Sequence, residues 1–214
     1  MKILNLYAGI GGNRKLWGED HEITAVEYKP EIAKIYQDFF PNDKVIIADA
    51  HEYLLEHFAE FDFIWSSPPC PSHSRIRRWT AVERGQNKPI YPNMKLYEEI
   101  IFLSSYFKGK YCVENVLPYY EPLIPAQKIG SHLFWMNFLT SSIGGEEDRK
   151  HNAVNKVLEE RKGFDLSGYK NLGIDKKLIL RNCVEPLIGK KILDCAINSP
   201  SLFKEEPIRG NPLL

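Results

Sequence analysis

Two side chains near the middle of the chain are of types that together can modify a nitrogen heterocycle. Cys70 lies in Ser-Pro-Pro-Cys-Pro, where prolines stiffen the backbone around a candidate nucleophile. Glu114 lies in Val-Glu-Asn-Val, and an acid beside such a cysteine can protonate or hydrogen-bond a ring nitrogen while the thiolate attacks the adjacent carbon. Nearby Arg75, Arg77 and Arg78 are expected to favour the thiolate.

The alternative for any cysteine is a small buried apolar residue, and we adopt it for Cys112, Cys183 and Cys195. No two cysteines form a Cys-x-x-Cys pair, so a zinc ribbon or a redox dithiol is not expected. We expect no metal site and no disulfide framework.

A second group of residues lies where three predicted strands end. Gly9 and Gly11 follow the first strand and can let the backbone approach a ligand closely. Glu27 can accept from ribose hydroxyls, Tyr28 can stack on an adenine, and Asp49 can accept from its amino group. The alternatives are a tight turn and ordinary helix caps. Together, the three strand ends predict a nucleoside-shaped pocket.

An alternation of strands and helices positions these residues, and it predicts an α/β fold with a largely parallel sheet. We expect residues 71–92 to form an irregular basic loop, and residues 178–197 a loop followed by a helix. Strands are expected at 2–7, 22–27, 45–49, 61–67, 110–116 and 132–139, and helices at 30–40, 51–58, 93–107 and 146–162.

Length and composition indicate one globular domain with an ordinary core. The 214 residues are 43% hydrophobic and 26% charged, which excludes a disordered chain. The N-terminus resembles a strand rather than a signal peptide, and no apolar run is long enough to span a membrane, so we expect an intracellular protein without membrane attachment.

The net charge is zero, but its distribution is uneven. Residues 1–65 carry 6 basic and 12 acidic side chains, residues 71–110 carry 8 and 3, and residues 146–191 carry 11 and 8. Such basic stretches are compatible with a polyanionic partner, although they are usually solvated surface.

The order of these segments resembles that of the DNA cytosine-5 methyltransferases. It runs Leu-Tyr-Ala-Gly-Ile-Gly-Gly, Val-Glu-Tyr-Lys-Pro-Glu, Ala-Asp-Ala-His-Glu-Tyr, Ser-Ser-Pro-Pro-Cys-Pro-Ser-His-Ser and Val-Glu-Asn-Val. Residues 126–135 and 180–193 resemble the family's later motifs. The resemblance covers residues 3–139 and 178–197 and implies a Rossmann-like methyltransferase fold, in a short phage-type or restriction–modification-type member.

The resemblance implies S-adenosylmethionine as cofactor, with S-adenosylhomocysteine as product. The residues expected to bind it are Tyr7, Ala8, Gly9, Gly11, Glu27, Tyr28, Asp49, Ala50, Pro68, Leu96 and Asn182.

The same resemblance implies double-stranded DNA as the partner. Cys70 would add to C6 of a flipped-out cytosine, Glu114 would stabilise charge at N3, and C5 would become methylated. The residues expected to contact DNA are His73, Ser74, Arg75, Arg78, Gln127, Arg149 and Lys150.

The sequence departs from the family at two places. Ile129 and Ser131 stand where the family has arginines, and His132, Lys128 or an arginine of residues 75–78 is a candidate substitute. Only residues 140–179 remain for target recognition, between a catalytic core at 1–139 and a C-terminal segment at 180–214. We therefore expect a loose recognition site, or a specificity partner or homodimer.

Three other functions remain open. A transfer-RNA cytosine-5 methyltransferase has a similar fold and would fit a small recognition region. A catalytically silent regulatory subunit would fit the absent arginine but not the presence of both Cys70 and Glu114. A small-molecule methyltransferase would require the ordered motifs to be coincidental.

Overall fold

The computed structural model describes residues 1–140, 155–169 and 173–200. These residues form a seven-stranded sheet in the order β3-β2-β1-β4-β5-β7-β6, parallel except for the antiparallel β7. The strands are β1 Lys2–Leu6, β2 Glu22–Glu27, β3 Lys44–Ile47, β4 Phe63–Ser66, β5 Lys110–Val116, β6 Gln127–Ile129 and β7 His132–Met136. The predicted Rossmann-like fold is confirmed.

The strand order reverses direction at β1, which pairs with β2 on one side and β4 on the other. In open parallel sheets, the crevice at such a switch point, outside the carboxyl ends of the strands, is the usual ligand site. The loops after β1 and β4 both begin there. These are the loops that carry the glycines and Cys70.

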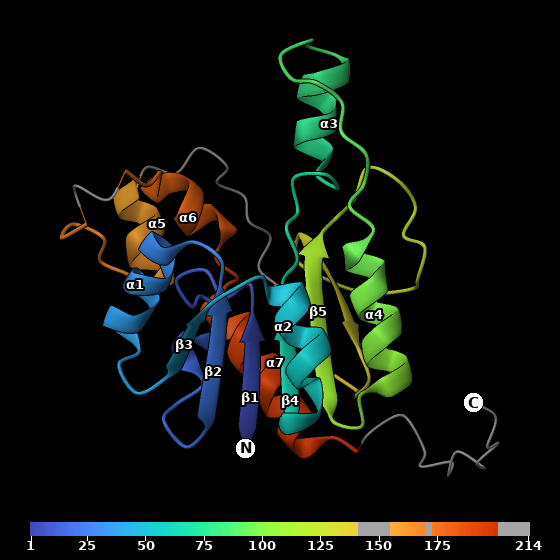
Figure 1. Ribbon diagram of the computed structural model, residues 1–214. Coiled ribbons are helices and arrows are strands. Elements are labelled where there is room, and N and C mark those ends of the chain that lie inside the picture. The colour runs from blue at the N-terminus through green and yellow to red at the C-terminus, as the bar shows by residue number, and fades with distance from the viewer. Residues whose placement is uncertain (141–154, 170–172, 201–214) are drawn as a thin grey trace.

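Helices cover both faces of the sheet (Figure 1). One face packs Leu54 of α2 and Leu103 of α4 against Ile64, and the other packs Ile192 of α7 against Trp65. The helices are α1 Pro30–Phe39, α2 Ala50–His57, α3 Arg75–Val82, α4 Lys95–Tyr106, α5 Asn155–Lys162, α6 Lys176–Asn182 and α7 Pro186–Asn198, and 3₁₀ turns lie at Arg14–Leu16 and Phe58–Glu60.

The segment around α5 and α6 is joined to the core on the α1 side of the molecule (Figure 1). Phe164 is 1% exposed, and its ring meets those of Phe39 and Phe40 at 4.9 and 6.4 Å between centroids. Leu166 and Leu180 are fully buried in the same cluster. Hydrophobic burial therefore attaches this segment to the sheet rather than leaving it as a separate body.

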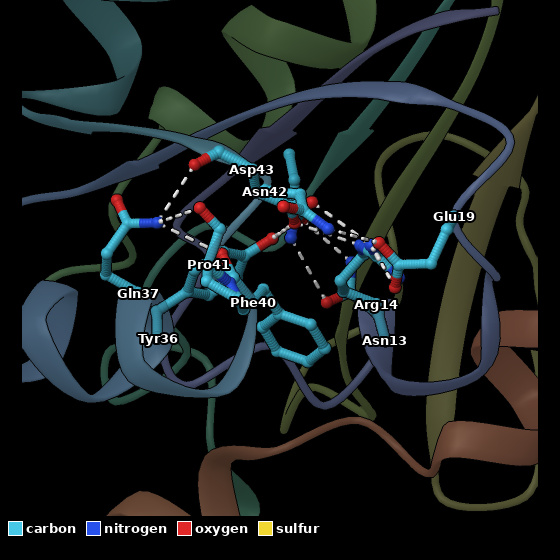
Figure 2. Close-up of polar contacts among 10 residues, drawn as sticks. Asn13, Arg14, Glu19, Tyr36, Gln37, Phe40, Pro41, Asn42 and Asp43 are labelled. Atoms are coloured by element: carbon cyan, nitrogen blue, oxygen red, sulfur yellow. Dashed lines mark hydrogen bonds and ion pairs between the residues drawn. The ribbon is translucent and has the colours of Figure 1, made fainter.

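A buried ion pair lies close to the glycine loop (Figure 2). The Arg14 guanidinium donates to both carboxylate oxygens of Asp43 at 2.9 and 3.0 Å, and the Tyr36 hydroxyl donates to Asp43 at 2.7 Å. Arg14 and Asp43 are 2% and 5% exposed. The bidentate pair fixes the turn after α1 against the residues that follow the glycines.

Two helices form where the sequence indicated loops. α3 lies within residues 71–92, and its N-cap is the Ser74 hydroxyl, which accepts from the Arg77 amide at 3.4 Å. No residue of α3 is buried, and the helix projects beyond the carboxyl ends of the strands (Figure 1). α6 occupies most of the second predicted loop, where the Asp175 side chain caps it. The expectation of irregular structure was wrong for both: α3 starts at a side-chain cap without a buried face, and α6 combines such a cap with buried Ile179 and Leu180.

Within the described residues, no helix is long and apolar enough to cross a membrane.

Candidate functional site

The turn after β1 has the backbone geometry of a ligand cradle. Gly9 has φ +55°, and a Cβ added there would meet no atom within 4 Å. A Cβ on Gly12 would lie 2.7 Å from the Val184 carbonyl, so this glycine is needed for packing. The turn is therefore closed against the C-terminal segment and open at Gly9. The opening fits a cofactor that approaches the backbone closely.

The two acidic strand ends have distinct local roles. Glu27 accepts from the Gly9 amide and from the Lys29 amide, both at 3.0 Å, so it couples the turn after β1 to the turn after β2. Asp49 caps α2 through one oxygen, which accepts from the His51 and Glu52 amides at 2.9 and 3.2 Å. The capping alternative is thus realised at Asp49, while its second oxygen makes none of these cap bonds.

The other predicted cofactor residues surround the same edge, with different exposures. Tyr28 is 72% exposed, so its ring is available for stacking. Ala8, Ala50, Pro68 and Leu96 are buried. Asn182 ends α6 in an exposed position, next to Cys183, which faces Gly12. The structure therefore brings the C-terminal segment to the glycine turn.

The loop that carries Cys70 is anchored to the end of β5. The Asn115 amide group donates to the Pro68 carbonyl at 2.9 Å, and Asn115 is 2% exposed. The Cys70 carbonyl accepts from the His73 and Ser74 amides at 3.0 and 3.1 Å. Asn115 follows Glu114 directly, so this single hydrogen bond joins the two segments predicted to act together.

The pKa of Cys70 moves in the direction opposite to the sequence expectation. Burial first, and then the negative charge of Glu114, raise the pKa of the thiol to about 11. The arginines expected to favour the thiolate do not outweigh these effects, and Arg75 instead donates to the Pro118 carbonyl at 2.8 Å. The expectation that these arginines favour the thiolate was therefore wrong.

This pKa predicts slow alkylation of Cys70 at neutral pH. At pH 8 about one thiol in a thousand is ionised, against roughly one in four for an ordinary cysteine. Its rate with iodoacetamide should rise about tenfold per pH unit from pH 8 to 10. Peptide mass spectrometry separates Cys70 from the other cysteines, and a rate that levels off below pH 9 would contradict the prediction.

Glu114 lies near the end of β5 and is 7% exposed. His132 of β7 places Nε2 3.6 Å from Glu114 Oε1, so a protonated imidazole would pair with this carboxylate. Ser131 is exposed at the preceding turn, and Ile129 is 2% exposed within the core. Of the candidate substitutes for the missing arginines, His132 is therefore the one that reaches Glu114.

The residues predicted to contact DNA differ in their exposure and in their hydrogen bonds. His73 is 1% exposed and pairs through Nδ1 with the Tyr120 hydroxyl at 2.6 Å, so a DNA contact by its side chain was a wrong expectation in this conformation. Ser74 caps α3, whereas Arg75, Arg78 and Gln127 are exposed. Arg149 and Lys150 lie outside the described residues.

A shallow basic pocket lies between α3 and the segment that follows it. Its volume is about 140 Å³, and no acidic side chain of the described residues lines it. Arg77, Arg78 and Lys88 supply its positive charge. Arg78 also lies over the Tyr119 ring at 5.7 Å from the guanidinium carbon to the centroid. The pocket therefore suits an anion such as a phosphate group.

Sequence reasoning missed three residues of this site. Asn115 stands in a recognisable motif, but its contact to Pro68 is not visible in the sequence. Tyr120 carries no signal of its own, although it holds His73. Glu99 is fully buried on α4, and a charged residue on the apolar face of a predicted helix was the available signal.

Comparison with known proteins identifies the family. The family model of C-5 cytosine-specific DNA methylases matches residues 1–116. No curated protein matches the chain. Solved structures that resemble part of it include a DNMT2 mutant from Spodoptera frugiperda, at 25% identity over 54% of this chain and 35% of that one, with a TM-score of 0.38.

Two further structures are more distant in sequence. The methyltransferase EhMeth of Entamoeba histolytica is 13% identical over 54% of this chain and 38% of that one, with a TM-score of 0.36. A SAM-dependent methyltransferase from Agrobacterium tumefaciens is 12% identical over 56% and 40%, with a TM-score of 0.39. The chain thus spans less than half the length of these three proteins. By the match over residues 1–116, it belongs to the C-5 cytosine-specific DNA methylase family.

Proposed function

We propose that this protein transfers a methyl group from S-adenosylmethionine to C5 of a flipped-out cytosine in duplex DNA, with Cys70 as the nucleophile. The observation that carries the proposal is the hydrogen bond from Asn115 to the Pro68 carbonyl at 2.9 Å. It fixes the Cys70 loop beside Glu114, whose charge acts on the Cys70 pKa. Family membership supports the same chemistry.

The glycine turn and the acidic strand ends fit the cofactor. Gly9 leaves open space, Glu27 and Asp49 offer carboxylate oxygens for ribose hydroxyls and the adenine amino group, and exposed Tyr28 offers a ring face. S-adenosylmethionine, when bound, supplies an electrophilic methyl group. The chain's own task is to orient the base and make C5 nucleophilic.

Cys70 and Glu114 perform that task together. The Cys70 thiol gives up its proton to water as its sulfur bonds to C6, and the Glu114 carboxyl group donates a hydrogen bond to N3, where negative charge develops. C5 can then accept the methyl group. A water molecule then takes the C5 proton while the C6–S bond breaks, so the aromatic ring is restored and Cys70 leaves as a thiolate that regains its proton from water. His132, whose Nε2 lies 3.6 Å from Glu114 Oε1, is the candidate to take the place of the family's arginine.

Labelled methyl transfer to duplex DNA and to bulk transfer RNA tests the proposal. Label on DNA is expected. A duplex containing 5-fluorocytosine should form a stable adduct whose mass equals protein plus methylated duplex, because a C5 fluorine does not leave as a proton does. Label on transfer RNA alone would overturn the DNA assignment, and absence of transfer to either would favour a silent subunit.

DNA binding should depend on the basic pocket beside α3. Replacing Arg77 and Arg78 by alanine removes two of its cations, so we expect the Kd for duplex DNA to rise about tenfold or more at low salt. The slope of log Kd against log salt should fall by about two. Fluorescence anisotropy over a salt series measures both.

Lys34 provides the matched control for this prediction, because it is exposed on α1, away from α3, and pairs with Asp38 at 3.1 Å. Lys34→Ala should leave both quantities near the wild-type values. An unchanged salt slope in the Arg77/Arg78 variant would show that DNA binds elsewhere.

A further inference from the structure

A single buried carboxylate on α4 accepts hydrogen bonds from three segments that are far apart in the sequence. Glu99 is 0% exposed. Its Oε1 accepts from the Tyr7 hydroxyl at 2.6 Å and pairs with His51 Nδ1 at 3.1 Å, and its Oε2 accepts from the Ser66 hydroxyl at 2.6 Å. Both oxygens are thus occupied by short bonds. Such a set of donors satisfies the hydrogen-bonding capacity of a carboxylate that is removed from water.

The three donors lie in or next to the turns that form the candidate site. Tyr7 opens the glycine turn after β1. His51 lies in the first turn of α2, two residues after Asp49. Ser66 is the last residue of β4, four positions before Cys70. Glu99 therefore connects the glycine turn, the Asp49 turn and the nucleophile loop from the helix that covers them.

Tyr7 shows why this connection affects geometry as well as stability. Its φ is +54°, which makes it the single non-glycine residue with positive φ among the described residues. A residue with a Cβ is strained at positive φ, and it keeps this backbone conformation only when surrounding contacts hold it in place. The bond from its hydroxyl to Glu99 fixes the side chain, and so holds the backbone at the point where the glycine turn begins.

We propose that Glu99 is the positioning residue of this enzyme: it contacts neither cofactor nor base, and it sets the glycine turn through Tyr7 and the Cys70 loop through Ser66. The inference rests on the proposed function, because it assigns cofactor binding to the first loop and nucleophilic attack to the second. Each of these two hydrogen bonds then has its own kinetic consequence. Loss of the Tyr7–Glu99 bond weakens cofactor binding, and loss of the Ser66–Glu99 bond slows turnover.

His51 adds a pH dependence to the same arrangement. Its Nδ1 must carry the proton in the bond to Glu99, and Nε2 lies 3.9 Å from Glu98. The hydrogen bond to Glu99 raises the pKa of His51, against opposing effects of burial and of Lys95. The stabilisation from protonated His51 is thus complete below the unfolded pKa near 6.5 and is lost as pH rises through the higher folded pKa.

Three substitutions distinguish the effect of the Tyr7–Glu99 hydrogen bond from that of the Ser66–Glu99 hydrogen bond. Calorimetry with S-adenosylhomocysteine gives the cofactor Kd without any need for DNA or Cys70, and single-turnover methylation gives the rate. In Tyr7→Phe, the Kd should rise about tenfold with the rate at saturating cofactor nearly unchanged. In Ser66→Ala, the rate should fall about tenfold with the Kd unchanged. Glu99→Gln should show at least one of the two changes, because its amide nitrogen cannot accept a hydrogen bond and takes the place of only one of the two carboxylate oxygens.

The surface residue Glu56 provides a matched glutamate control, since Glu56→Gln removes an exposed carboxylate on α2. The stabilisation of wild type at pH 6 relative to pH 8 should shrink in Glu99→Gln and persist in Glu56→Gln.

If Glu99→Gln fails to fold, the Tyr7 and Ser66 variants still test the inference. Equal changes of Kd and rate in both of them, or none, would overturn the inference. A wild-type protein that does not bind S-adenosylhomocysteine would instead overturn the proposed function.

Discussion

Replacing Cys70 by alanine is expected to lower the rate of methyl transfer by about 10⁴-fold or more. The reason is chemical, because C5 of cytosine is a poor nucleophile until a group adds at C6. No other cysteine can take over this role: Cys112 and Cys183 are buried, and Cys195 lies on α7. Single-turnover transfer of labelled methyl to duplex DNA measures the loss.

Two measurements keep this result interpretable. The Kd for S-adenosylhomocysteine should stay within about twofold of wild type, since the proposed mechanism assigns Cys70 to the base rather than to the cofactor. Cys195→Ala should transfer methyl at the wild-type rate. Substantial transfer by Cys70→Ala would show that the reaction proceeds without this covalent adduct.

Replacing Arg14 by methionine is expected to lower the free energy of unfolding by about 3–5 kcal/mol. The substitution keeps most of the side-chain volume but leaves the Asp43 carboxylate buried with the Tyr36 hydroxyl as its remaining side-chain donor. Figure 2 shows that Glu19 also faces this guanidinium, at 3.3 Å. Urea unfolding followed by circular dichroism gives the change.

A second substitution identifies the buried charge as the cause. Arg14→Met combined with Asp43→Asn should recover part of the loss, because the amide oxygen still accepts from Tyr36 and no charge remains buried. A loss below about 1 kcal/mol in the single variant would show that water reaches Asp43 once the guanidinium is gone.

The parallel half of the fold follows from local patterns in the sequence. Alternating apolar runs and helix starts, such as Pro30 at the first position of α1, place β1 to β5 and their helices close to the observed bounds. The position of the site can be predicted in the same way, since the carboxyl ends of parallel strands lie at one edge of the sheet. Strand order along the chain is therefore enough to group Glu27, Asp49, Cys70 and Glu114 at one edge of the sheet.

The remaining features depend on contacts that periodicity does not encode. α3 forms without a buried face, so no apolar pattern announces it. His73 resembles a surface histidine in sequence, yet it is buried and bonded to Tyr120, 47 residues later. The Cys70 pKa depends on desolvation and on the Glu114 charge. Whether these two effects outweigh the nearby arginines depends on where the side chains lie, and the sequence does not give those positions. The role of Glu99 depends on three residues that are distant in the sequence, Tyr7, His51 and Ser66, and that meet at α4.

The raised pKa of Cys70 has a consequence for the lifetime of the enzyme. A methyltransferase that uses a sulfur nucleophile holds that sulfur in the same site as a reactive sulfonium donor. A resting thiolate would be open to self-methylation, which would inactivate the protein irreversibly. With a pKa of about 11, Cys70 rests as the neutral thiol at cellular pH. In the reaction that we propose, its proton is removed only as the sulfur bonds to the base. The burial that slows the first step thereby protects the catalyst from its own methyl donor.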